Sequence, residues 1–368
     1  MPAEPPTTPP LPALPKVELH CHLDGIIDPP MTRDLLAAGV ALPFTEEELA
    51  GRHPVTDMDS FLKWYDVGGR LDGSIVPFFP IIAAHIGRLK AQGVVYTEIM
   101  IAGSEIPDDP AVRLEQIGAF RRHVDRLEEG KIQVEFLMAV GKGKSPDRIR
   151  RLADRALSLH QAGLICGFCL AGLEQGFPVR PYREVLAELR EAGLGIAIHA
   201  GEWAGPESVW EALENGCPHR IGHGTHAFAD PRLIKHLAEH RIHLEMCPTS
   251  NHRTGSIARL ADHPVRRAWE AGVPFSIATD DPGIFRNTIA GEYRLLADTF
   301  GFTPDDLLAV TRAGLAARFQ PTLRGPAAAL ADRESPSGPA ACRHPGISIR
   351  MPWDEGGTGC LKPNRSSP

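Results

Sequence analysis

Imidazoles and carboxylates fall at the ends of strand-like segments in this 368-residue chain. His20 and His22 end one such segment and are separated by a single residue, so on a strand their side chains point the same way. Four more groups end later segments in the same manner: His199, His223, Asp280 and Asp281. Imidazole nitrogens with a carboxylate and space for water are typical of a catalytic zinc site rather than a structural one.

Taken singly, each of these groups has a simpler explanation. A lone His-x-His arises by chance among 16 histidines, and Asp-Asp-Pro is commonly just a turn. Glu98 and Glu174 also lie near strand ends, where each either supports a site residue or forms an ion pair at the rim. The joint placement of so many suitable groups favours a metal site.

The elements that must position these groups are eight β-rich segments that alternate with helical ones. Helical periodicity is clear in Arg151–Gln161 and Tyr182–Ala192. Eight such strands predict an α/β fold of the closed (β/α)₈, or TIM barrel, type, in which all strand carboxyl ends meet at one face. The predicted strands are Lys16–His22, Val94–Ile101, Ile132–Val140, Leu164–Ala171, Gly195–His199, Arg220–His223, Ile242–Cys247 and Val273–Thr279.

The connection between the first two predicted strands is unusually long. Roughly 70 residues lie there, far more than a simple loop needs, so we expect extra helices over one mouth of the barrel. Phe61, Leu62 and Tyr65 form an apolar cluster in this stretch, and we expect them to contact a ligand. Ordinary helix packing would explain each of them equally well.

The composition narrows the class of protein. The formal net charge of −7 argues against nucleic acid as a partner, because neutralising phosphates requires clustered Lys and Arg. Apolar runs stay well below bilayer length, so we expect no membrane partner. Seven cysteines without a repeated spacing favour the reducing cytoplasm.

The chain ends differ from the middle in composition. Residues 1–14 are rich in Pro and predict a flexible, extended arm. From Pro321 onward Pro, Gly, Ser and Arg dominate and helical periodicity disappears, so we predict a disordered tail over 321–368. The barrel domain is therefore expected to span residues 15–320.

Five motifs in this chain resemble those of the adenosine deaminases, within the amidohydrolase superfamily. They occur in family order between about Pro15 and Phe319: PKVELHCHLDG (15–25), AIHAGE (197–202), RIGHGT (220–225), MCPTSN (246–251) and TDDP (279–282). Family members are (β/α)₈ barrels that hold one zinc ion. The resemblance thus implies Zn²⁺ as the cofactor and a small-molecule purine nucleoside as the partner, and it leaves the oligomeric state open.

The resemblance also assigns roles to residues. It implies that Glu202 protonates the purine ring nitrogen beside the reacting carbon, that His223 orients the attacking water, and that Asp281 contacts both water and purine. Gly172 would offer its backbone amide to the base, and Asp24 would bind the ribose hydroxyl. The implied metal ligands are His20, His22, His199 and Asp280.

The choice of substrate depends on the first motif. Asp24 within HLDG is typical of relatives that act on the nucleoside, which favours adenosine or 2′-deoxyadenosine. Relatives that act on free adenine or on modified nucleosides such as aminodeoxyfutalosine tend to carry Glu there, and these substrates are the alternative. Another amidohydrolase reaction is a third possibility, although the fourth strand offers no lysine for a two-metal site. The chain departs from the family pattern at Met100, Cys169, Leu173 and Ala278.

Overall fold

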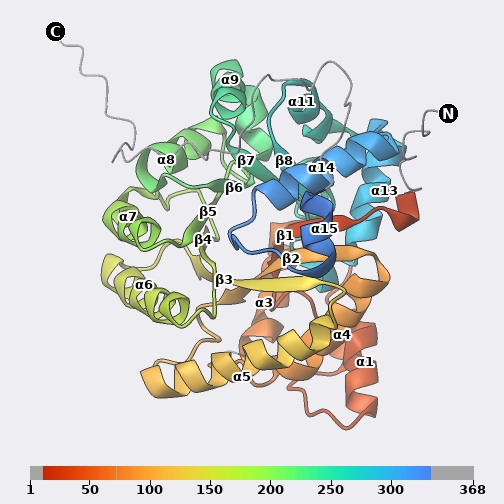
Figure 1. The fold of residues 1–368 in the computed structure, drawn as a ribbon, viewed down its shortest axis with the longest axis vertical. Coiled ribbons are helices and arrows are strands. Elements are labelled where there is room, and N and C mark those ends of the chain that lie inside the picture. The colour runs from red at the N-terminus through yellow and green to blue at the C-terminus, as the bar shows by residue number, and fades with distance from the viewer. Residues whose placement is uncertain (1–10, 72, 333–368) are drawn as a thin grey trace.

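Eight parallel strands pair in chain order and form a barrel surrounded by helices (Figure 1). This computed structural model describes residues 11–71 and 73–332, except for the side chains of residues 12 and 65–69. All eight expected strands are present, and the TIM-barrel prediction is confirmed. The strands are β1 Lys16–His22, β2 Val94–Ala102, β3 Gln133–Gly141, β4 Gly167–Ala171, β5 Gly195–Ala200, β6 Arg220–His223, β7 His243–Met246 and β8 Phe275–Ile277.

The barrel closes where β1 and the segment after β8 meet. The backbone N–H of His22 donates to the carbonyl of Asp280 over 2.8 Å, and the N–H of Asp280 donates to the carbonyl of His20 over 3.1 Å. A parallel bridge pairs Cys21 with Asp280 at the same point. The regular pairing of β7 with β8 ends at Ile277, so β8 is two residues shorter at this end than expected. The bridge at Asp280 lies beyond it.

Helices cover the outside of the barrel, as the sequence predicts. The long insertion between β1 and β2 contains α1 to α4, which confirms the extra helices. The helices are α1 Pro29–Ala37, α2 Glu46–Ala50, α3 Met58–Gly68, α4 Phe78–Ala91, α5 Pro110–Glu128, α6 Pro146–Gln161, α7 Arg183–Glu191, α8 Pro206–Gly216, α9 Pro231–Glu239, α10 Pro248–Arg253, α11 Val265–Glu270, α12 Pro282–Phe285, α13 Ile289–Phe300, α14 Pro304–Ala316 and α15 Gly325–Ala331.

Several helices begin at a capping residue followed directly by proline. The side chains of Asp109, Ser145 and Thr303 accept hydrogen bonds from the first free backbone N–H groups of α5, α6 and α14. Asp306 returns the bond at Thr303 and completes a capping box. Proline at the first helical position removes an N–H that would otherwise be unsatisfied, so these local sequences fix where the helices start.

The structure corrects the predictions for the two ends of the chain. Leu11–Ala13 form a short 3₁₀ turn and Leu14 is fully buried, so the predicted flexible arm is wrong for residues 11–14. The predicted tail is wrong where α15 forms, because Ala327 and Leu330 pack against apolar side chains at the amino-terminal ends of β1 and β2. Residues 1–10 and 333–368 lie outside the described residues.

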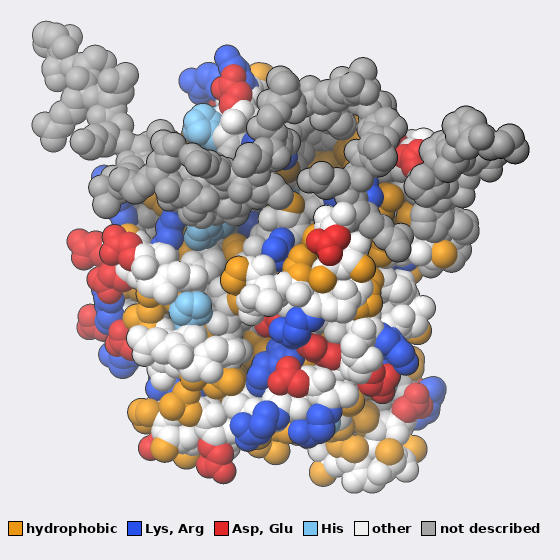
Figure 2. All heavy atoms as spheres, viewed as in Figure 1, with side chains coloured by type: hydrophobic (Ala, Val, Ile, Leu, Met, Phe, Trp, Pro, Cys, Tyr) orange, Lys and Arg blue, Asp and Glu red, His pale blue; other side chains and the backbone are white. Residues whose placement is uncertain are grey.

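The side of the barrel seen in Figure 1 is covered by α14 and α15. On the described surface of this side, Lys and Arg lie interspersed with Asp and Glu (Figure 2). Within residues 11–71 and 73–332, no helix is long and apolar enough to cross a membrane.

Candidate active site and metal centre

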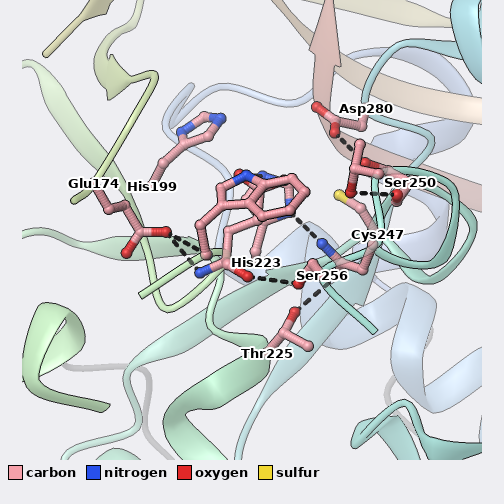
Figure 3. A network of polar contacts seen from close by, with 12 residues as sticks. Glu174, His199, His223, Thr225, Cys247, Ser250, Ser256 and Asp280 are labelled. Atoms are coloured by element: carbon pink, nitrogen blue, oxygen red, sulfur yellow. Dashed lines mark hydrogen bonds and ion pairs between the residues drawn. The ribbon is translucent and has the colours of Figure 1, made fainter. Parts of the chain in front are cut away.

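Metal-ligating side chains converge at the carboxyl ends of the strands. His20, His199, His223 and Asp280 each offer one ligand atom, and these four atoms lie within 4.8 Å of one another. His22 joins them, with its Nε2 3.5 Å from Asp280 Oδ1. Four of these five are the ligands that the resemblance implies, and His223 is the additional member. Figure 3 shows His199, His223 and Asp280 around the centre of this group.

The contacts of His20 show that the group suits a cation. Its Nδ1 lies 2.7 Å from Glu245 Oε2, and its buried Nε2 lies 3.3 Å from Asp280 Oδ1 without making a hydrogen bond to any described residue. Burial alone would lower the pKa of His20, but the carboxylates of Asp280 and Glu245 raise it to about 10. The site therefore attracts positive charge, and a divalent ion can take the place of the proton on Nε2, which has no hydrogen-bond partner among the described residues.

Asp280 is held in place by its backbone and by one hydroxyl. Its φ of +66° lies in the left-handed region, which aims the side chain across the mouth of the barrel. Ser250 Oγ donates to Asp280 Oδ2 over 2.6 Å (Figure 3). Burial would raise the pKa of Asp280, but the close contact with His20 and the charges of the neighbouring imidazoles lower it, so the carboxylate stays ionised. Ser250 belongs to the MCPTSN motif, but no residue of this motif was predicted as a site residue from the sequence.

A chain of buried charges supports His20 from inside the barrel. Arg220 forms ion pairs with Glu245 and with Glu98, the latter at 2.6 Å, and its guanidinium lies 3.5 Å from the ring centre of Phe319. Glu98 is therefore a partner of Arg220 in the barrel interior rather than part of a rim ion pair. Glu245 is not among the site residues predicted from the sequence, although a lone carboxylate within the buried strand HLEM was a usable signal.

Glu202 lies in the loop after β5, beside His223. Its Oε2 is 3.4 Å from His223 Nε2. Burial raises the pKa of Glu202 well above its usual value, and the negative charges of Asp280 and Glu174 add to the effect. A protonated carboxyl next to the metal group is the arrangement that a general acid requires.

Glu174 fixes the backbone of that loop. Its carboxylate accepts hydrogen bonds from the N–H groups of Gly201 at 2.6 Å, Glu202 at 2.8 Å and Trp203 at 2.9 Å (Figure 3). Ser208 Oγ donates a fourth bond to it. Glu174 therefore supports a site residue and does not form a rim ion pair with any described residue, because its carboxylate holds the backbone from which the Glu202 side chain extends.

Polar contacts also orient the two remaining imidazoles. Asn251 Nδ2 lies 3.2 Å from His223 Nδ1, and Thr225 Oγ1 donates to Asn251 Oδ1 over 2.9 Å. Burial lowers the pKa of His223 to about 4, so the ring is neutral at pH 7. His199 Nδ1 lies 3.4 Å from Cys169 Sγ, one of the positions at which the chain departs from the pattern that its motifs resemble.

Asp281 is buried where the chain turns into α12. A Cβ atom placed on Gly25 would lie 1.9 Å from Asp281 Oδ1, so the glycine of HLDG is what allows this close approach. Asp24 is half-buried in the same loop. Gly172 follows β4 at the same face of the barrel, with a φ of +81° that favours glycine.

Phe61, Leu62 and Tyr65 of the insertion were expected to contact a ligand, and their side chains lie in different surroundings. Phe61 stacks on Phe285 of α12, with ring centres 5.3 Å apart. Leu62 is 44% exposed, which is more than a residue enclosed with a ligand would be. The side chain of Tyr65 lies outside the described residues.

Comparisons with known proteins agree with the fold and show the family. The family model "Adenosine deaminase" matches residues 15–330. An adenine deaminase from Rhizobium leguminosarum bv. trifolii is 34% identical over 309 residues, which cover 83% of this chain and 95% of that protein. An aminodeoxyfutalosine deaminase from Acidothermus cellulolyticus is 32% identical over 295 residues, which cover 77% and 83%.

A solved structure resembles the whole barrel. The crystal structure of an adenine deaminase from Arthrobacter aurescens superimposes with a TM-score of 0.75 at 26% identity and covers 86% of this chain and 97% of that one. The expected hydrolase chemistry on C–N bonds of cyclic amidines is therefore confirmed at the level of reaction class. The chain belongs to the adenosine deaminase family.

Proposed function

We propose that this protein uses zinc to remove the exocyclic amino group of a 6-aminopurine by hydrolysis, with adenine or a modified adenine as its substrate. The observation that carries the proposal is the position of Glu202, a carboxyl with a raised pKa, 3.4 Å from His223 and beside the cation-attracting group around His20. A metal group, a general acid and a neutral imidazole are the parts that hydrolytic deamination needs.

The residues proposed to hold the ion are those that the resemblance implied: His20, His22, His199 and Asp280. A bound zinc ion supplies a Lewis acid that lowers the pKa of water from about 15.7 to about 7. The unbonded Nε2 of His20 and the ionised carboxylate of Asp280 support this assignment. One ring nitrogen of His223 also lies within 4.8 Å of the ligand atoms of His20, His199 and Asp280. We propose that His223 faces the attacking water and is not itself a metal ligand.

The chain's own residues would then move the protons. Glu202 gives its proton to the ring nitrogen next to the reacting carbon as water adds there, because attack on an aromatic ring requires that nitrogen to accept the displaced electron pair. The Nδ1 of the neutral His223 ring accepts from Asn251, so its Nε2–H donates a hydrogen bond to the attacking oxygen. Asp281 holds the water and the five-membered ring of the purine. Glu202, ionised after the transfer to the ring nitrogen, takes the proton of the added hydroxyl group and passes it to the amino group. The C–N bond then breaks, ammonia leaves, and a carbonyl remains on the ring carbon.

The relatives favour a different substrate from the one that Asp24 suggested. The first motif favours adenosine and 2′-deoxyadenosine, with adenine or a modified adenine nucleoside as the alternative. Matched relatives are described as adenine deaminases and as an aminodeoxyfutalosine deaminase, which supports the alternative. Gly172, Phe61 and Asp24 are proposed to bound the space for the base and its substituent.

The test is the ultraviolet spectrum of the zinc-loaded protein with adenine, adenosine, 2′-deoxyadenosine and aminodeoxyfutalosine, since loss of the amino group shifts the purine absorbance. We expect adenine or aminodeoxyfutalosine to be converted with a higher kcat/KM than adenosine. Preference for adenosine would restore the first choice of the sequence. Failure of all four substrates to release ammonia would remove the deaminase proposal.

A further inference from the structure

A small cavity lies between the insertion that joins β1 to β2 and the two short helices α10 and α12. Its volume is about 110 Å³, and its lining comes from residues 53–55, from Arg253 at the end of α10 and from residues 284–286 around the end of α12. Its place in the fold follows from α10, which also supplies Ser250 to Asp280 and Asn251 to His223. The cavity therefore lies at the catalytic face of the barrel.

Positive charge gathers around this cavity. Arg253 and Arg286 both line it, and in the described part of the chain neither forms an ion pair. The pKa of His53 is lowered to about 4, first by burial and then by the charges of Arg286 and Arg253, and both of these arginines line the cavity with this ring. The one acidic group that also acts on His53 is Asp28, and that carboxylate is already paired with Arg88 at 2.5 Å.

The remaining walls are apolar, and one polar atom there has no partner. Val55, Ile284 and Phe285 are almost completely buried. His53 Nε2 is shielded from water and makes no hydrogen bond with the residues that the structure describes. Two exposed arginines without an ion pair among the described residues, an apolar lining and a ring nitrogen without a described partner form a place for one compact anionic group such as a phosphate or a carboxylate.

The cavity is within reach of a purine bound at the metal group. Arg253 follows Ser250 by three residues, which is about 4.5 Å along the axis of a helix. Phe285 lines the cavity and also stacks on Phe61, the insertion residue expected to contact the ligand. A substituent on the purine that passes these rings would bring its far end to the two arginines.

We propose that the substrate is a 6-aminopurine nucleoside with an anionic group on its sugar-side substituent, and that His53, Arg253 and Arg286 bind that group. This inference rests on the proposed function and deepens it, because it selects a charged, modified adenine over free adenine. A phosphate and a carboxylate share the chemistry that the cavity recognises, and the test separates them.

Activity with a series of substrates tests the proposal. The zinc-loaded enzyme is given adenine, adenosine, adenosine 5′-monophosphate and adenosine 5′-carboxylic acid, and kcat/KM is measured for each. We expect at least one anionic substrate to exceed adenosine, and the better of the two identifies the group. If adenosine or adenine exceeds both anionic substrates, the proposed subsite is overturned.

Variants then connect the preference to the cavity. Arg253→Gln and Arg286→Gln should each lower the ratio of kcat/KM for the anionic substrate over adenosine by about 10- to 100-fold, mainly through KM, because a charge-assisted contact is lost. Arg294→Gln, which removes an exposed arginine of α13 outside the cavity, should leave the ratio unchanged. Ratios within twofold of the parent in both cavity variants would refute the assignment.

A binding measurement separates this inference from the proposed function. Calorimetry of adenosine 5′-monophosphate with the Glu202→Gln protein requires no turnover, and the same experiment is repeated after adding Arg286→Gln. Weaker binding in the double variant supports the subsite even if no purine is deaminated, in which case only the proposed function fails. Equal binding, or none to either protein, overturns the subsite even if adenine is converted.

Discussion

The backbone N–H of His22 donates to the carbonyl oxygen of Asp280 over 2.8 Å, and this bond joins the first strand of the barrel to the segment after the last. Two proposed metal ligands, 258 positions apart, are thus brought together by the same contact that closes the fold. Since the bond uses only backbone atoms, side-chain substitutions can test the metal group without opening the barrel.

Asp280→Asn should remove the charge and keep the fold. Asparagine tolerates the left-handed backbone conformation at this position, and the backbone bonds to His20 and His22 are unaffected. We expect zinc affinity to fall by more than about 100-fold. Loss of a residue that only hydrogen-bonds to a metal ligand typically lowers metal affinity by about 10- to 100-fold, and loss of the ligand itself should lower it more. Zinc content after dialysis and the circular dichroism spectrum check the two halves of this prediction.

Glu245→Gln should weaken zinc binding through His20. The charged acceptor at 2.7 Å keeps the proton of a neutral His20 on Nδ1 and leaves Nε2 free, whereas an amide can present a donor instead. We expect zinc affinity to fall about 10- to 100-fold in competition with a chelator at pH 7. Glu239→Gln, on the exposed side of α9, is the control, and equal affinity in the two variants would contradict a role for Glu245.

Glu202→Gln should separate catalysis from metal binding. Glutamine keeps the shape of the side chain but has no acidic proton to give to the ring nitrogen, so we expect kcat to fall by about 10²- to 10⁴-fold. Zinc content should match that of the parent protein, because Glu202 is not among the proposed ligands. Near-normal turnover in this variant would remove Glu202 from the mechanism.

Leu330→Ala should show that α15 is part of the domain. Leu330 is buried against the apolar cluster that includes Val17, Leu19 and Tyr96, and truncating such a side chain typically costs about 2–5 kcal/mol. The free energy of unfolding from urea denaturation measures the loss. Leu173→Ala, at a side chain that is 45% exposed, should change it by less than about 0.5 kcal/mol. Equal effects would mean that α15 adds little to stability.

Glu292 should make the protein less stable as the pH rises toward neutrality. Burial raises the pKa of this carboxyl from its ordinary value of 4.5 to about 7. Between these values the folded state binds more protons than the unfolded one, so the free energy of unfolding falls with increasing pH, by up to about 3 kcal/mol, and levels off above pH 7.

Chemical denaturation between pH 4.5 and 8 checks this prediction. Glu292→Gln cannot ionise, so its unfolding free energy should decline less steeply than that of the parent over the same window, although Thr249 and Asn287 lose part of their acceptor. Glu239→Gln is again the surface control and should follow the parent curve. Parallel curves for Glu292→Gln and the parent would rule out this carboxyl as the cause.

Local sequence determined much of the barrel. The bounds of β1 and β6 match the pattern of apolar and polar residues, because strand periodicity and turn signals depend only on neighbours in the chain. The same local signals placed His20, His22, His199 and Asp280 at strand ends. Since parallel strands in a barrel share one catalytic face, their convergence could be expected from the sequence once the fold class was recognised.

Only the tertiary structure decided which buried groups support that site and what lies beside it. Glu245 is 225 residues from His20, and Glu98 is 122 residues from Arg220, so no local pattern links either pair. The helix α15 is stabilised by burial of Ala327 and Leu330 on the barrel rather than by its own weak periodicity. The cavity at Arg253 exists for the same reason: it is bounded by three segments that meet only when the barrel closes.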